Sequence, residues 1–190
     1  MGGWLVRQWG RVAGPGWTWQ QFIACILPAA IYSQLLLLYA GVAHYGWSPW
    51  QKVVAFVIVF DVVGGAIVFN TSQAKFWYHR PERKFWDFFR FNALHIHPFI
   101  IAWVFFPHMN WIYGVSVYSV MIVSTVVVLL LPIRYKGIAA AIVVVAGCRV
   151  FEVFEGPPVG FLWFEPVYYM KVLLGHCVPP FGARREQVGI

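Results

Sequence analysis

Residues 53–70 read VVAFVIVFDVVGGAIVFN, and this stretch decides the class of fold. Every residue in it except Asp61 and Asn70 is apolar or glycine. A helix needs about 20 mostly apolar residues to cross the hydrocarbon core of a bilayer. The stretch therefore predicts a transmembrane helix that carries a single carboxylate near its middle.

The composition of the whole chain extends this prediction. The protein has 190 residues, of which 61% are hydrophobic and 11% are charged. Soluble domains carry roughly 25% charged and about 45–50% apolar residues. We therefore expect lipid to be the solvent and the fold to be an all-α, polytopic membrane helix bundle. Residues 1–20 are expected to form an interfacial segment, residues 21–180 the bundle and residues 181–190 a cytoplasmic tail.

The positive charges predict the topology. Six apolar runs are candidate spans, and the last is interrupted by charged residues: 21–43, 52–70, 88–106, 111–131, 137–154 and 159–178. Lys and Arg occur before the first run, in every second connection, and after the last run, while the alternate connections have none. The positive-inside rule then predicts six spans with both termini cytoplasmic, in a membrane of the bacterial plasma-membrane type. The first run is too long for a cleaved signal peptide, so we expect it to be retained.

The net charge of +7 is explained by this pattern. The sequence has no basic face and no platform of stacking aromatics, so nucleic acid is not an expected partner. The expected partners are the lipid bilayer and either other membrane subunits or further copies of the chain.

Asp61 is the first candidate site residue, because ionisable groups at membrane depth usually face a protein interior or a wet cavity. Gly64 and Gly65 follow at i+3 and i+4, so they share its helix face and leave room beside it. One interpretation is a ligand niche or proton site. The other is close helix packing, with Asp61 serving only as a hydrogen-bonding partner.

His95 and His97 lie at a depth similar to that of Asp61. In a straight helix, residues i and i+2 point about 200° apart. Pro98 removes a backbone donor and frees the carbonyl of Leu94, so a kink there would turn both imidazoles toward one cavity. Two hypotheses remain: proton transfer by Asp61, His95 and His97, or neutral histidines that neighbouring helices satisfy. A metal bound by the same three residues is a weaker alternative, because no established zinc spacing supports it.

Further ionisable residues lie in the fifth and sixth runs. Arg149 and Glu152 are spaced i and i+3, as in an ion pair on one helix face or an anion clamp at the site. Lys171 lies at mid-depth and requires a carboxylate partner, either Glu152 or the one in the second run. For Glu165 and His176, the simplest interpretation is that they reach an interface by snorkelling.

A polar cluster follows the second run at the cytoplasmic boundary. Lys75 and His79 share a face if the helix continues, and Asn70 and Arg80 add hydrogen-bond donors nearby. These residues are candidates for binding a phosphate or a lipid headgroup. The alternative is a positive-inside anchor within an aromatic belt.

Three functions are consistent with these residues. The first is a membrane-embedded enzyme or binder that takes a lipid-soluble molecule from the cytoplasmic side, with Asp61, His95 and His97 supplying acid–base chemistry. The second is a proton or small-solute transporter that uses the same groups as a relay. The third is a structural subunit of a larger membrane complex. No motif identifies a cofactor. Polar residues crowd the inner face and are scarce at the outer face, which favours the enzyme or binder.

Overall fold

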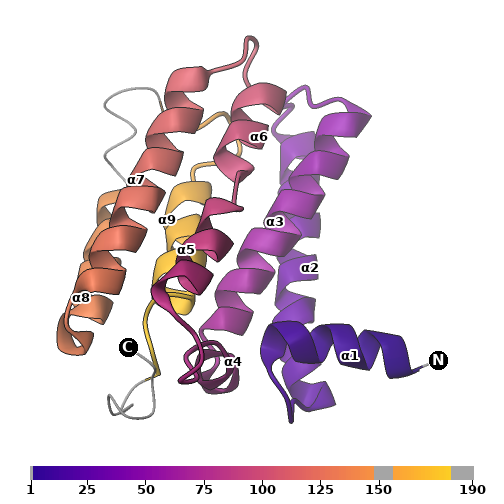
Figure 1. Ribbon diagram of the computed structural model, residues 1–190. Helices are drawn as coiled ribbons and strands as arrows, with labels where there is room; N and C mark the ends of the chain where they lie inside the picture. Colours follow the sequence, from indigo (N-terminus) through magenta and orange to yellow (C-terminus); the bar gives the residue numbers. More distant parts are fainter. Residues whose placement is uncertain (1, 148–155, 181–190) are drawn as a thin grey trace.

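The computed structural model describes residues 2–147 and 156–180, and this part of the chain is all-helical (Figure 1). Three helices are long and apolar enough to cross a membrane: α2 (Trp19–Val42), α3 (Pro49–Phe69) and α7 (Trp111–Leu130). They fall on the first, second and fourth expected spans. The helical class, and three helices of membrane-spanning length and composition, are thereby confirmed.

Local capping explains where these helices begin. Thr18 accepts a hydrogen bond from the backbone of Gln21, and the Gln21 side chain accepts one from the backbone of Thr18. Ser48 and Gln51 make the same reciprocal pair ahead of α3. The Asn110 side chain accepts from the third residue of α7. Each arrangement satisfies amide groups that the first helical turn leaves without partners.

The expected span at 88–106 is not one helix. It consists of α5 (Phe85–Ala93) and α6 (His97–Val104), with a break between them. Pro98 explains the break: it has no amide hydrogen to donate within a continuous helix, but it fits the first turn of a new one. The expectation of a single kinked helix was therefore wrong.

Two buried or half-buried tyrosines stabilise this break. The hydroxyl of Tyr118 donates to the carbonyl of Ala93 at 2.7 Å, and that of Tyr168 donates to the carbonyl of His95 at 2.6 Å. Carbonyl groups at a helix end need such partners, since each unsatisfied group in an apolar environment is costly. The two hydrogen bonds thus hold the backbone of the break in place at Ala93 and at His95.

The last two expected spans also differ in extent. α8 (Ile133–Gly147) begins before residue 137, and the rest of that expected span lies outside the described residues. In the sixth, α9 (Phe164–Tyr169) passes directly into a π-helix, η1 (Met170–Gly175). Together they rise only about 18 Å, less than the roughly 30 Å of a hydrocarbon core. The number of spans stays a prediction.

Two short helices lie at one end of the bundle. α1 (Gly2–Ala13) crosses the lower end in Figure 1, and α4 (Ser72–Tyr78) lies near it. Gly14, directly after α1, lies against Trp77 of α4. A side chain does not fit at this position, because φ is +87° and a Cβ there would lie 2.8 Å from Cβ of Trp77. Residues 2–13 are therefore an ordered helix, and their location at a membrane interface stays a prediction.

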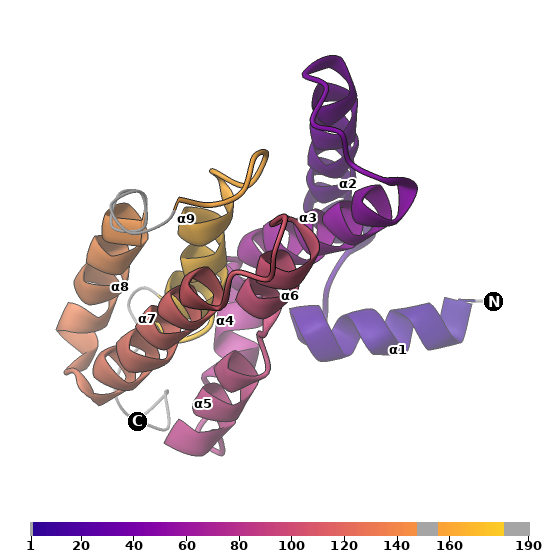
Figure 2. The same ribbon diagram turned by 90° about the horizontal axis from the view of Figure 1, so that it is seen from above.

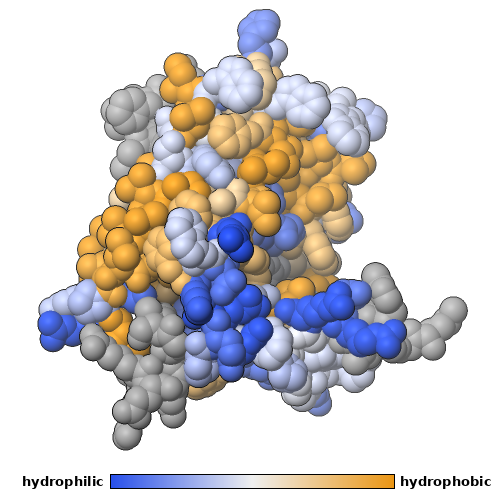
Figure 3. Space-filling view, viewed as in Figure 1, coloured by the Kyte–Doolittle hydropathy of each residue, from blue (hydrophilic) through white to orange (hydrophobic). Residues whose placement is uncertain are grey.

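The surface of the long helices is apolar. On α2 the residues Leu35, Leu38 and Val42 are 57%, 64% and 77% exposed. Figure 3 shows apolar side chains over most of the visible face, with hydrophilic ones gathered at the lower end. Soluble monomers rarely expose apolar surface on this scale, so a membrane location fits this face. Figure 2 shows α2 projecting away from the other helices, while α3 packs on α2 and also on η1 and α9.

Candidate functional site

Two ionisable side chains from separate helices contact the carboxylate of Asp61 on α3. The ammonium of Lys171, on η1, donates to Oδ2 of Asp61 at 2.5 Å. His97, at the start of α6, places its Nε2 2.9 Å from the same oxygen. Lys171 is 3% exposed and Asp61 is 50% exposed at the side-chain level. We call these three residues the carboxylate cluster. The structure thus brings together three residues that the sequence placed at a common depth.

Gly65 provides the space for this contact. A Cβ atom at Gly65 would lie 2.4 Å from Cε and 2.8 Å from Cδ of Lys171. At Gly64 it would meet only Cβ of Ala29, at 3.4 Å. The two glycines therefore differ: Gly65 makes room for the lysine, whereas a methyl group at Gly64 would meet α2 in ordinary van der Waals contact. Room for a ligand or a proton site beside Asp61 stays a prediction.

His95 lies beside the cluster in a different chemical state from His97. Its Nδ1 contacts the carbonyl of Phe91 at 2.7 Å, and a carbonyl can only accept, so Nδ1 carries the proton. In the neutral form of the ring, this leaves the lone pair on Nε2, which is then the acceptor. His97 instead presents Nε2 to Asp61, and its Nδ1 is buried without a partner. The two ring centroids are 5.6 Å apart.

A cavity of about 390 Å³ opens next to the carboxylate cluster. We call it the main cavity. Asp61, Lys171 and His95 line it, together with Tyr78, whereas His97 does not. Its other walls are apolar side chains and the two glycines, contributed by α1, α2, α3 and α5: Trp9, Val12, Ile26, Phe60, Gly64, Gly65, Val68, Phe69 and Phe91. An apolar cavity with a few convergent polar groups is the usual form of a small-molecule site.

The predicted cluster at 70–80 has other contacts. The ammonium of Lys75 donates to the carbonyls of Leu174, Gly175 and Val178, the last two at 3.3 and 2.9 Å. These carbonyls lie at and just after the C-terminal end of η1, where a cation is stabilising. Lys75 thereby holds the helix that carries Lys171. The sequence did not predict this role of Lys75, because only the fold brings residues 75 and 174–178 together.

The two other donors of that stretch also bond locally. Asn70 ends α3, and its amide donates to the carbonyl of Ala66. Arg80 lies over the ring of Trp77 at 4.0 Å and donates to its carbonyl. Neither lines the main cavity. The expected continuation of the second span is replaced by a break at Asn70 and a new helix that Thr71 caps.

His79, in the same stretch, is 2% exposed and its ring packs against Phe88. Among the described residues, neither ring nitrogen makes a hydrogen bond of good geometry. Burial, together with the nearby charges of Lys75 and Lys136, lowers the pKa of His79 to about 3. His79 is therefore neutral at pH 7.

This burial predicts an acid-sensitive fold. The unfolded state binds a proton at His79 below pH 6.5, while the folded state does not until about pH 3. Stability should fall as the pH drops through this window, by at most about 1.4 kcal/mol per pH unit. The variant His79→Phe should show a shallower decrease in melting temperature between pH 7 and pH 4. Equal slopes for the variant and the wild type would contradict this assignment.

Two expectations for the sixth run were wrong. His176 is 3% exposed and its ring stacks on Phe91 at 3.8 Å, so it does not reach an interface. Glu165 is 2% exposed and accepts a hydrogen bond from Tyr113 at 2.6 Å. Packing of α9 and η1 inside the bundle explains both.

Arg149 and Glu152 lie outside the described residues. Within residues 2–147 and 156–180, no three His, Cys, Asp or Glu side chains are grouped closely enough to hold a metal ion. Oδ2 of Asp61 already contacts a lysine and a histidine. The geometry gives no support to a metal site built from His95, His97 and Asp61.

No family model matches the sequence, and neither a curated protein nor a solved structure matches the chain. The arguments about function therefore rest on the geometry of the site.

Proposed function

We propose that the protein is a multi-pass membrane protein with six spans and both termini in the cytoplasm of a bacterium. Three helices of spanning length support a multi-pass arrangement. The alternation of basic and non-basic connections supports the count of six and the orientation.

We further propose that it binds a lipid-soluble molecule in the main cavity and acts on it by acid–base chemistry. The observation that carries this proposal is the half-exposed carboxylate of Asp61, held by Lys171 and His97 beside a cavity with apolar walls. A structural ion pair would need no adjoining cavity. Packing alone would not require an ionisable cluster here, because a fold with apolar residues of similar volume in its place is often at least as stable.

Each polar group has a separate role in this proposal. Asp61 accepts a hydrogen bond from the bound molecule through Oδ1, since Oδ2 is occupied by Lys171 and His97. Lys171 stabilises negative charge that develops next to it. His95 lines the cavity with an unprotonated Nε2 and accepts a proton. His97 positions the carboxylate and does not contact the ligand.

The aromatic residues at the opposite end favour this function over transport. Trp47, Phe105 and Phe161 pack together there, with ring centroids 4.4–5.7 Å apart. A carrier needs polar access from both sides of the site. These rings pack against one another at that end, and we propose access from the side of α1 and α4.

Filling the main cavity should abolish binding. Ile26 of α2 lines the cavity, and Ile31 of the same helix is 50% exposed and does not. Protein purified in mild detergent should retain a stoichiometric small molecule that native mass spectrometry detects. The variant Ile26→Trp should lose this mass, and the control Ile31→Trp should keep it. If the wild type carries no bound molecule, or if both variants keep it, the proposal fails.

A further inference from the structure

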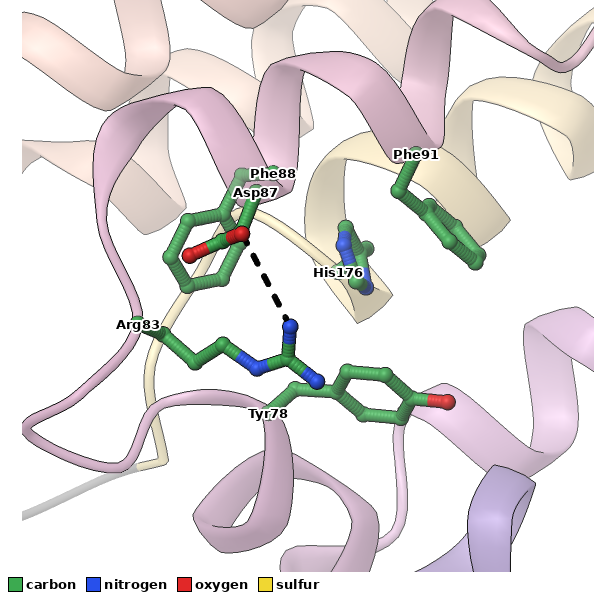
Figure 4. Close-up of a pocket in the computed structure, with 6 residues that line it drawn as sticks. All are labelled: Tyr78, Arg83, Asp87, Phe88, Phe91 and His176. Atoms are coloured by element: carbon green, nitrogen blue, oxygen red, sulfur yellow. Dashed lines mark ion pairs between the residues drawn. The ribbon is translucent and has the colours of Figure 1, made fainter.

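A second, smaller cavity of about 90 Å³ lies between α4, α5 and the end of η1, and we call it the inner pocket. Figure 4 shows the six residues that line it: Tyr78, Arg83, Asp87, Phe88, Phe91 and His176. The rings of Tyr78 and Phe91 also line the main cavity. The two cavities therefore adjoin.

Two buried nitrogen atoms of the inner pocket lack partners. Nε of Arg83 and Nδ1 of His176 are buried without a hydrogen-bond partner among the described residues. A guanidinium can only donate, so Arg83 requires an acceptor. Leaving one such buried group unpaired costs about 1–3 kcal/mol.

Asp87 does not supply this acceptor. The dashed line in Figure 4 marks an ion pair between Oδ1 of Asp87 and Nη1 of Arg83; at 3.9 Å this contact is too long for a hydrogen bond. Oδ2 of Asp87 accepts from the backbone amide of Lys84 at 2.9 Å and so caps α5. The negative charge of Asp87 is used at the helix N-terminus, where it is favourable.

The charges around the inner pocket favour an anion. Arg83 is 33% exposed, so the pocket can be reached from the interface. Lys75 and Lys136 also lie close enough to influence the buried imidazole of His79. The pocket itself is lined by the guanidinium of Arg83, the imidazole of His176 and a single carboxylate, that of Asp87, and the two lysines add positive charge behind it. A ligand with several acceptor oxygens and negative charge would complete this arrangement.

We propose that the inner pocket binds a phosphate-type oxyanion through Arg83 and His176, and that this oxyanion is the headgroup of an amphipathic molecule. The apolar part of the molecule lies in the main cavity, across the rings of Tyr78 and Phe91. The second half of this inference rests on the function proposed above for the main cavity. It names the class of ligand: an amphipathic phosphate ester that enters from the side of α1 and α4.

Binding of a soluble short-chain phosphatidic acid to the detergent-purified protein tests this inference. Native mass spectrometry would give the apparent dissociation constant. Arg83→Gln should raise it at least about tenfold, because a charge-assisted guanidinium–phosphate contact is lost. The matched control Lys84→Gln removes the same charge from the exposed neighbouring residue and should change the constant less than about twofold. Equal effects of the two variants, or no binding to the wild type, would overturn the inference.

A second variant and a second probe complete the experiment. Arg83→Lys retains the charge but loses the fork of donors, so it should bind with intermediate affinity even if Arg83→Gln fails to fold. Inorganic phosphate is the second probe. If phosphatidic acid binds at least about tenfold more tightly, the amphipathic assignment holds. If the two bind equally, the pocket holds an oxyanion but the headgroup assignment is wrong.

The variant Ile26→Trp separates this inference from the proposed function. It should weaken binding of phosphatidic acid but leave binding of inorganic phosphate unchanged, because Ile26 does not line the inner pocket. If the retained molecule contains no phosphorus and Arg83→Gln keeps it, the proposed function stands and the inner-pocket inference falls. If phosphate binds through Arg83 but no molecule occupies the main cavity, the oxyanion pocket stands and the proposed function falls.

Discussion

The variant Asp61→Asn should destabilise the protein by about 3 kcal/mol, because it leaves the ammonium of Lys171 buried without a counter-charge. Lys171 is 3% exposed at the side-chain level, whereas Asp61 is 50% exposed. The reverse change, Lys171→Met, should therefore cost less: the remaining carboxylate is accessible and still contacts His97. The asymmetry follows from which partner is enclosed.

The double variant Asp61→Asn/Lys171→Met should recover most of the loss, since neither uncompensated charge remains. The measurement is a double-mutant cycle on melting temperature in one detergent, in which a coupling of at least about 1 kcal/mol is expected. Lys52→Met is the control on the same helix. Lys52 is exposed and should contribute less than about 0.5 kcal/mol. Strictly additive effects of the two site variants would show that the ion pair does not exist.

The adjacent glycines should respond in opposite ways to the same substitution. Gly65→Ala places a methyl group where Cε and Cδ of Lys171 lie, at 2.4 and 2.8 Å. We expect a loss of about 1–3 kcal/mol, as for other overpacked interiors, and displacement of the ammonium from Asp61. Gly64→Ala meets only Ala29 at 3.4 Å and should be neutral or slightly stabilising, because alanine favours the helix.

The same substitution in a Lys171→Ala background tests whether the clash with Lys171 causes this loss. Lys171→Ala removes the atoms that the new methyl group would strike, so Gly65→Ala should cost little in that background. Thermal unfolding of the four variants measures this directly. If Gly65→Ala is as well tolerated as Gly64→Ala in the wild-type chain, the space beside Asp61 does not serve Lys171.

The long helices could be predicted from the sequence, and so could the candidates from which the carboxylate cluster is drawn, although not which of them contact Asp61. An apolar run of about 20 residues encodes a span by itself, as α2, α3 and α7 show. Ionisable residues are so costly in such runs that Asp61, His97 and Lys171 stand out without any structural knowledge. Counting residues along each helix then gave them a common depth.

The remaining features depend on contacts between distant segments. The break at residues 94–96 is stabilised by Tyr118 and Tyr168, which lie far along the chain, so the sequence indicated only that Pro98 disturbs the helix. It could not give the different orientations of His95 and His97. The burial of His176 likewise follows from how η1 packs on α3 and α5, and no periodicity in residues 164–176 encodes that packing.

The central claim is that one lipid-soluble molecule occupies the main cavity and contacts the carboxylate cluster. An experimental density map of the protein in a lipid bilayer tests it most directly, with Ile26→Trp as the empty reference. We predict discrete density in the wild-type cavity, within hydrogen-bonding distance of Oδ1 of Asp61, and its absence in the variant. A wild-type cavity that is closed, or filled only by disordered acyl chains continuous with the surrounding bilayer, would contradict the claim.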